Sequence, residues 1–153
     1  MRRNDKAIID RAAIDAIIRR ATVCRLGLCD GDQPYVVPLC FGYDGASLYL
    51  HSAPAGFKLD LLRKNPRVCV EFDIDTELVR GADACAWGMK FRSVIAFGTA
   101  AIVADADEKR RSLTAIMRQY GSDAADFADA AVAGTTIVRV AIASMTGKES
   151  GYR

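Results

Sequence analysis

Two spacings of apolar residues alternate along this chain, and together they predict a protein of strands with helices inserted between them. Within residues 10–21 apolar side chains recur every three or four positions, which predicts an amphipathic helix capped by Asp10. The same spacing predicts a second helix over 107–120 and shorter helices over 54–64 and 124–133.

The remaining apolar runs have the shorter period of strands. Strands are expected at 23–29, 34–43, 46–51, 67–73, 91–103 and 136–143. Asp-Gly pairs at 30–31 and 44–45 predict that the first three strands form an antiparallel meander. Gly98 predicts a bulge or corner, and 76–85 is expected to be loop. The fold class is therefore α+β, mainly β: a small barrel or curled sheet of six antiparallel strands with flanking helices.

Composition limits the functional classes. The chain has 153 residues, of which 51% are hydrophobic and 26% charged, so 1–153 is expected to be one folded domain. Its 21 basic and 19 acidic residues give no reason to expect a nucleic-acid partner. No apolar run approaches the roughly 20 residues of a membrane span, and Met1–Lys6 leads into no apolar block. We expect no membrane partner and a cytoplasmic location.

The chain lacks the usual catalytic and metal-binding motifs. Its five cysteines are an odd number with no C-x-x-C pair, which indicates free thiols in a reducing compartment. One histidine cannot complete the usual mixed metal sites, so no metal site is expected. The sequence also contains no P-loop, no dinucleotide-binding glycine fingerprint and no nucleophile elbow.

The single histidine, His51, ends a predicted strand. Side chains alternate along a strand, so Leu48 and Leu50 share one face and His51 points to the other. Its position fits either a surface or interface histidine or a residue of a functional site.

The segment after His51 runs from a strand end into a helix N-terminus. Such a turn offers free N–H groups and the positive end of the helix dipole, which suits a phosphate group. Ser52 adds a hydroxyl, Gly56 permits close approach of the backbone, and Lys58 adds a positive charge. The apolar face of the helix is expected to comprise Phe57, Leu61 and Leu62.

Two further positions are candidates for ligand contacts. Arg92 and Ser93 open the long strand and offer polar groups, although a strand-edge arginine commonly extends into water. Trp87 suits stacking on a planar ligand, with a core or interface position as the alternative.

In combination these residues resemble a known family. The motifs are Val36-Val37-Pro38-Leu39, Tyr49-Leu50-His51-Ser52, Gly56-x-Lys58, Asn65-Pro66-Arg67-Val68 and Arg92-Ser93-Val94-Ile95 with the later Gly98. Together they resemble the FMN-binding split-barrel proteins related to pyridoxamine 5'-phosphate oxidase. Among these, the chain is most similar to the nitroimidazole-resistance (Nim-type) flavoproteins, over nearly its whole length.

The resemblance implies a six-stranded split barrel that forms a homodimer with two FMN sites at the interface. By position, Val36, Val37, Pro38 and Leu39 would line the flavin with their backbone. His51 and Ser52 would lie beside the flavin and its phosphate, Lys58 would bind the phosphate, and Ser93 would lie near the flavin ring. His51 would also be the candidate catalytic residue.

Two departures from the oxidase bear on the activity. The segment 148–153 lacks the Trp- and Arg-bearing end of the oxidase, and Phe57 replaces a second basic phosphate ligand. We therefore expect an FMN-dependent oxidoreductase that reduces nitroimidazole-type or other small planar substrates, rather than a pyridoxamine-phosphate oxidase. FAD and haem are the less favoured cofactors. The alternative function is a non-enzymatic flavin- or haem-binding module used for storage or sensing.

Overall fold

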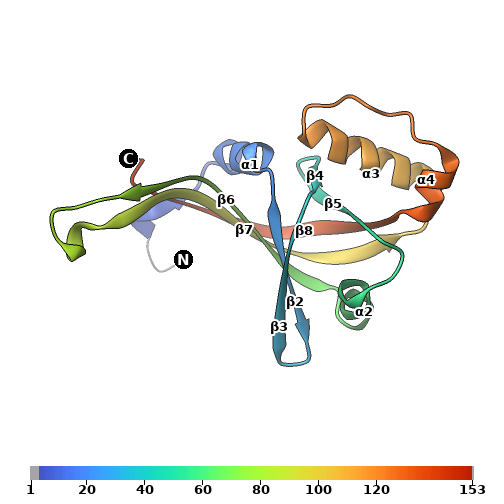
Figure 1. The fold of residues 1–153 in the computed structure, drawn as a ribbon, viewed down its shortest axis with the longest axis horizontal. Helices are drawn as coiled ribbons and strands as arrows, with labels where there is room; N and C mark the ends of the chain where they lie inside the picture. Colours follow the sequence, from blue (N-terminus) through green and yellow to red (C-terminus); the bar gives the residue numbers. More distant parts are fainter. Residues whose placement is uncertain (1–3, 153) are drawn as a thin grey trace.

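An antiparallel sheet forms the body of the protein, and helices lie against both of its faces (Figure 1). The computed structural model describes residues 4–152. Met1–Arg3, part of the segment 1–6 discussed above, lie outside this range. The strands are β1 (Ala7–Ile8), β2 (Cys24–Asp30), β3 (Gln33–Leu39), β4 (Gly42–Tyr43), β5 (Ser47–Ser52), β6 (Arg67–Val79), β7 (Gly88–Val103) and β8 (Thr136–Ser150). The α-helices are α1 (Arg11–Arg20), α2 (Phe57–Lys64), α3 (Ala106–Gln119) and α4 (Asp129–Gly134), with short 3-10 turns η1 (Asn4–Lys6) and η2 (Ala84–Ala86).

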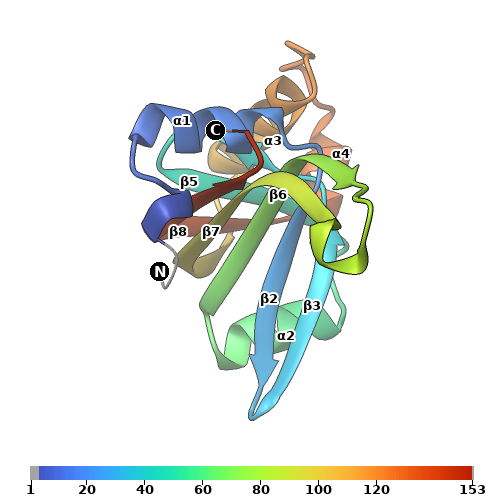
Figure 2. The same ribbon diagram turned by 90° about the vertical axis from the view of Figure 1, so that its left-hand side faces the viewer.

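The strand order is β3-β2-β6-β7-β8-β5-β4, with β1 added beside β8, and every pairing is antiparallel. Among the described residues the outer strands β3 and β4 do not pair with each other, so the sheet curls without closing (Figure 2). Six of these strands have six or more residues, which confirms the expected six-stranded, mainly β architecture.

Strands β6 and β7 extend well beyond the body as a two-stranded arm (Figure 1). The sequence predicted a loop over 76–85, which is wrong for its first part. Glu77, Leu78 and Val79 pair with the start of β7 after a register shift that follows Ile74. The irregular residues of a bulge hide the strand period, although the ladder resumes beyond them.

The main core lies between the sheet and helices α1 and α2. Ile14, Ile17 and Ile18 of α1 are buried, and the Asp10 carboxylate accepts hydrogen bonds from the N–H groups of the first turn, as predicted. On α2 the buried residues are Leu59, Leu61 and Leu62. Phe57 was expected on this face, but Leu59 is buried there instead.

The predicted meander is wrong at its third strand. β3 pairs with β2, but β5 pairs with β8 on the far side of the sheet. Between them the chain passes under α3 at Gly42, where a Cβ atom would lie 2.5 Å from the backbone nitrogen of Ile116. The side chain of Tyr120 holds this crossing, because its hydroxyl accepts from the N–H of Phe41 and donates to the carbonyl of Thr22.

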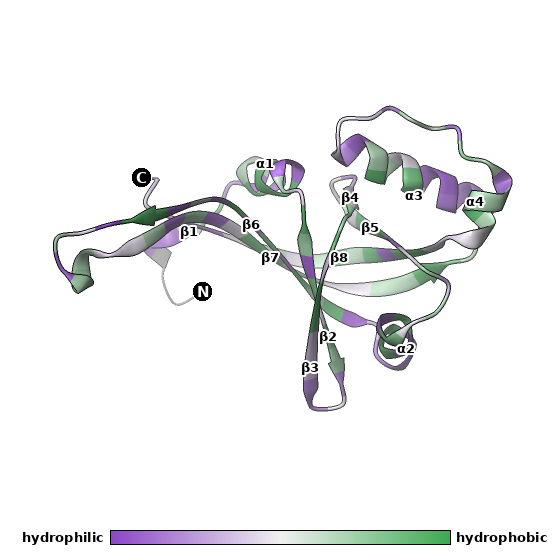
Figure 3. Ribbon diagram, viewed as in Figure 1, coloured by the Kyte–Doolittle hydropathy of each residue, from purple (hydrophilic) through white to green (hydrophobic). Residues whose placement is uncertain are grey.

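A second, smaller core lies under α3. It contains Val103, Ile116 and Ile137, with Tyr49 and Leu113 packed against it. Hydrophilic residues alternate with hydrophobic ones along α3 (Figure 3), because only one side of the helix packs on this core.

The C-terminal elements differ in length from those expected. α4 is shorter than the predicted helix at 124–133, and β8 continues to Ser150 because it pairs with β7 along its length. The predicted irregularity at Gly98 is confirmed by a register shift between Phe97 and Gly98. Within residues 4–152, none of the helices has the length and apolar character needed to span a bilayer.

Candidate functional site

The end of β5 presents the two polar residues expected there. Leu48 and Leu50 are fully buried, whereas His51 is exposed on the other face, as the strand alternation predicted. Ser52 is half-buried at the strand end. The exposed turn 53–56 then leads into α2, and Gly56 has φ 143°, a conformation that L side chains rarely adopt.

The N-terminus of α2 lacks a side-chain cap, because Gly56 is the N-cap residue. Lys58, in the first turn, is half-buried, and burial lowers its pKa, while its nearness to Cys24 acts weakly in the other direction. Among the described residues no carboxylate pairs with Lys58, and the nearby Asp60 pairs instead with Arg63 at 2.8 Å. Uncapped N–H groups beside an unpaired ammonium form a place for an anion.

Phe57 links this turn to β3. Phe57 is 51% exposed, and its ring meets the ring of Tyr35 edge-on, with centroids 5.2 Å apart. Tyr35 in turn packs against the main core. An aromatic contact therefore holds the beginning of α2 next to the strand that the sequence predicted to line a ligand.

The four predicted residues of β3 divide between two faces of the sheet. Val37 and Leu39 pack against the core, whereas Val36 (61% exposed) and Pro38 face outward. The side chains of the four therefore do not share one face, and the expected main-chain contacts to a flavin stay a prediction.

The outward residues of neighbouring strands form rows with Val36 and Pro38. The register aligns Val36 with Gly27, Cys69 and Phe97, and aligns Pro38 with Arg25, Glu71 and Ile95. We call this surface the open face, defined by Val36, Pro38, Cys69, Ser93, Ile95 and Phe97. Gly27 leaves a gap in the first row, since it has no side chain.

The sequence reasoning named Val36, Pro38 and Ser93 but missed the other three residues of this open face. The alternating burial of β6 and β7 places Cys69, Ile95 and Phe97 outward. Arg25 bonds to both Glu71 and Asp73 across the open face. Burial and the charge of Asp73 raise the pKa of Glu71, and Arg25 offsets only part of that.

The structure separates Arg92 from Ser93. Ser93 lies on the open face, and Arg92 points to the opposite face, as neighbours on a strand must. The Arg92 guanidinium donates to Asp75 at 2.6 Å and Glu149 at 3.3 Å, and it stacks over the ring of Tyr152 at 4.1 Å. Arg92 is therefore engaged with partners of its own on the face opposite Ser93.

Trp87 lies in the arm and is 50% exposed. It precedes the first residue of β7, whereas His51 is linked through Ile137 to Val103, the last residue of that strand. Sixteen strand residues cover about 50 Å when straight, so Trp87 and His51 of one chain lie near opposite ends of a long strand.

Comparison with known proteins assigns most of the chain to one family. The family model described as pyridoxamine 5'-phosphate oxidase matches residues 10–149. The chain belongs to the pyridoxamine 5'-phosphate oxidase family. The candidate site residues, among them His51, Lys58 and Ser93, lie within the matched region.

Two solved structures of similar proteins support the family fold. A proposed 5-nitroimidazole antibiotic resistance protein from Bacteroides thetaiotaomicron is 37% identical, with a TM-score of 0.84 over 94% of this chain and 86% of that one. An FAD-binding protein from Mesorhizobium loti is 26% identical, with a TM-score of 0.68 over 94% of this chain and 96% of that one. The split-barrel fold expected from the sequence is confirmed.

A curated relative matches a shorter stretch. An uncharacterized protein of Rhizobium meliloti (strain 1021) is 34% identical over 64 residues, which are 42% of this chain and 42% of the relative. The match thus spans less than half the length of that relative.

Proposed function

We propose that this member of the pyridoxamine 5'-phosphate oxidase family is a cytoplasmic FMN-dependent oxidoreductase that reduces small planar compounds of the nitroimidazole type. One observation carries the proposal: Lys58 is half-buried beside the uncapped N-terminus of α2 and has no carboxylate partner within residues 4–152. The similarity to a proposed nitroimidazole-resistance protein at 37% identity and to an FAD-binding protein at 26% supports it.

The residues present fit a phosphate-bearing flavin. Lys58, Ser52 and the N–H groups at the start of α2 would hold the phosphate, since they are donors without a carboxylate partner among the described residues. The β3 backbone and Ser93 would meet the flavin ring along the open face. We propose FMN rather than FAD because this cradle suits one terminal phosphate.

The bound flavin would supply the electron transfer, and the protein would bind and orient it. His51 is exposed at the end of β5, beside Ser52, where it is free to contact a substrate. An imidazole can donate a proton or hydrogen bond near neutral pH, so His51 would assist as the nitro group accepts electrons.

The same proposal includes a homodimer. Val36 and Phe97 (53% exposed) are apolar, belong to one row of the open face, and face solvent in a single chain. Burying such a patch against a second copy removes apolar surface from water and would cover a flavin lying on the open face. A two-fold dimer is the commonest closed assembly.

Anaerobic mixing tests the activity. Protein loaded with FMN is reduced, then mixed with a 5-nitroimidazole, and the reoxidation of the flavin is followed by its visible absorption. We expect reoxidation faster than for free reduced FMN, with nitro-free imidazole inactive. Equal rates for bound and free FMN would contradict enzymatic function and favour the alternative, a flavin-holding module. A haem spectrum in the purified protein would favour the haem-binding form of that alternative.

A further inference from the structure

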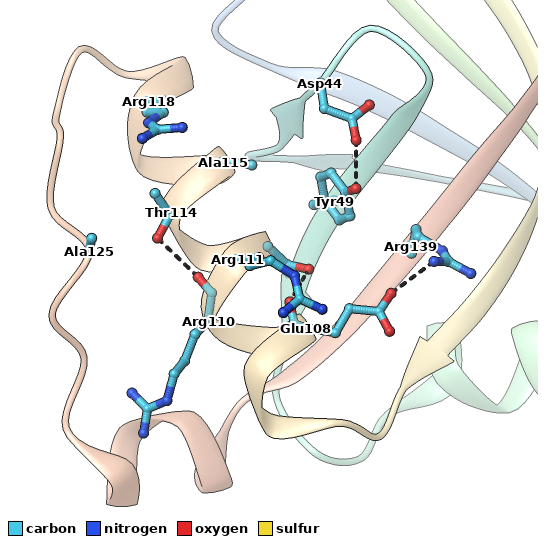
Figure 4. A pocket seen from close by; sticks show the side chains of 11 residues that line it. Asp44, Tyr49, Glu108, Arg110, Arg111, Thr114, Ala115, Arg118, Ala125 and Arg139 are labelled. Atoms are coloured by element: carbon cyan, nitrogen blue, oxygen red, sulfur yellow. Dashed lines mark hydrogen bonds and ion pairs between the residues drawn. The ribbon is translucent and has the colours of Figure 1, made fainter.

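A groove on α3 is separate from the site described above. It has a volume of about 770 Å³ and lies between α3, the α3–α4 connection and the β4–β5 turn (Figure 4). We call it the α3 groove, lined among others by Tyr49, Arg111, Ala115, Arg118, Ala125 and Arg139. Its volume lies within the roughly 300–1,000 Å³ of small-molecule sites.

Small side chains create the depression. Ala115 lies between Arg111 and Arg118 on one side of α3, and Ala125 lies across from the helix on the connection (Figure 4). The two arginines are seven residues apart, so they are rooted about 10 Å from each other along the helix. Both side chains are long enough to reach a ligand seated over Ala115.

Four arginines and two carboxylates line the α3 groove, and the carboxylates are already engaged. The Asp44 carboxylate accepts from the N–H groups of Ala46 and Ser47 at 2.8 and 2.7 Å, and from the Tyr49 hydroxyl at 2.6 Å. Burial acts to raise the pKa of Asp44, but these hydrogen bonds outweigh it and lower the pKa.

The arginines differ in what they contact. Arg110 turns away toward α4, where it donates to the carbonyl of Phe127 and to Asp129 (Figure 4). Arg139 donates to Glu108 at 2.9 Å.

The guanidinium groups of Arg111 and Arg118 have N–H donors available for a ligand. Arg111 has no side-chain partner among residues 4–152. In the part of the chain that the structure describes, Arg118 pairs only with the fully exposed Asp123, at 4.0 Å.

We propose that the α3 groove binds a small molecule through its phosphate groups, held by Arg111 and Arg118. Guanidinium groups bind phosphate oxygens with paired, charge-assisted hydrogen bonds, and both groups have donors available. This ligand is a second one, distinct from the proposed flavin, because Lys58 and Ser52 do not line the groove. Tyr49 links the two sites, since it precedes His51 by two residues on the same face of β5.

Calorimetric titration with ADP tests the proposal. The protein is first saturated with FMN, so that the phosphate cradle at Lys58 is filled. We expect ADP and inorganic pyrophosphate to bind and adenosine not to bind. Arg111→Gln and Arg118→Gln should each weaken ADP binding roughly tenfold or more. Arg80→Gln, an equal charge change at an exposed residue of the arm, should leave it unchanged.

The outcome is independent of the flavin proposal. ADP binding that survives Lys58→Ala but not the double variant of Arg111 and Arg118 supports the groove, even in a protein that takes up no FMN. The groove proposal is overturned if neither ADP nor pyrophosphate binds. It is also overturned if the double variant binds them as the wild type does. Binding of polyglutamate without binding of pyrophosphate also overturns it, in favour of an acidic protein partner.

Discussion

His51 of β5 and Ile137 of β8 are direct register partners on one face of the sheet, yet Ile137 is fully buried and His51 is exposed. The small core under α3 covers Ile137 and ends before it reaches His51. The only histidine of the chain therefore lies at the boundary between the covered and the uncovered parts of this face.

His51→Ala should leave the fold and flavin content intact, since the side chain is exposed and its removal opens no cavity. Loss of general acid assistance should slow reoxidation of the reduced flavin by a nitroimidazole by about 10²–10⁴. Single-turnover reoxidation at matched flavin occupancy measures the effect. Rates within twofold of wild type would remove the catalytic role, and loss of flavin would make His51 a cofactor-binding residue instead.

Lys58→Ala should weaken FMN binding while leaving riboflavin binding nearly unchanged, because riboflavin lacks the phosphate. A charge-assisted contact contributes about 1.5–3 kcal/mol, or roughly ten- to hundredfold in affinity. Fluorescence titration with both flavins gives the comparison. Lys64→Ala is the matched control, an exposed residue of the same helix that pairs with Asp30. Equal weakening of both flavins would place the phosphate elsewhere.

FMN binding should also take up a proton at alkaline pH. Burial lowers the pKa of Lys58 below its ordinary value of 10.5 in the flavin-free protein, and a bound phosphate should raise it again. Between the lowered value and 10.5 the unfolded chain binds more protons at Lys58 than the folded one. The stability of the flavin-free protein therefore gains from this group as pH rises through that window.

Calorimetry in two buffers of different ionisation enthalpy detects this proton. The apparent binding enthalpy of FMN should depend on the buffer just below pH 10.5. Lys58→Ala should abolish the dependence. A buffer effect of the same size in that variant would assign the proton to another group.

The open face should hold the dimer together. Phe97→Asp places a charge in the apolar row with Val36 and should yield a monomer with weakened FMN binding. Ile9→Asp, at a residue 93% exposed, makes the same chemical change away from the open face and should remain dimeric. Light scattering with FMN present reports the mass. A wild-type protein that is monomeric, or a Phe97→Asp variant that stays dimeric, would contradict this assembly.

Local signals in the sequence predicted much of this architecture. Asp10 marks the start of α1, and the alternation around Leu48 and Leu50 places His51 on the other face. Such features depend on neighbours along the chain, so a single sequence contains them. The proposed phosphate cradle also rests on residues close in sequence, Ser52, Gly56 and Lys58, and it stays a prediction.

Some predictions failed because contacts between residues far apart in the sequence determine the structure. The partner of β5 depends on Gly42 passing against Ile116 of α3, which no short-range pattern reports. Phe57 has the spacing of a core residue of α2, but its contact with Tyr35 of β3 holds it at the surface. Arg92 and Ser93 were named together as polar residues at the start of a strand, and the structure shows that they point to opposite faces.

The cofactor of the purified protein tests the central claim most directly. Denaturation of the protein releases any bound molecule. That molecule is identified by its absorption spectrum and by chromatography against FMN, FAD and riboflavin standards. We predict FMN at about one molecule per chain, either as purified or after incubation with FMN and removal of the excess. A protein that carries no flavin and takes up none would contradict the account.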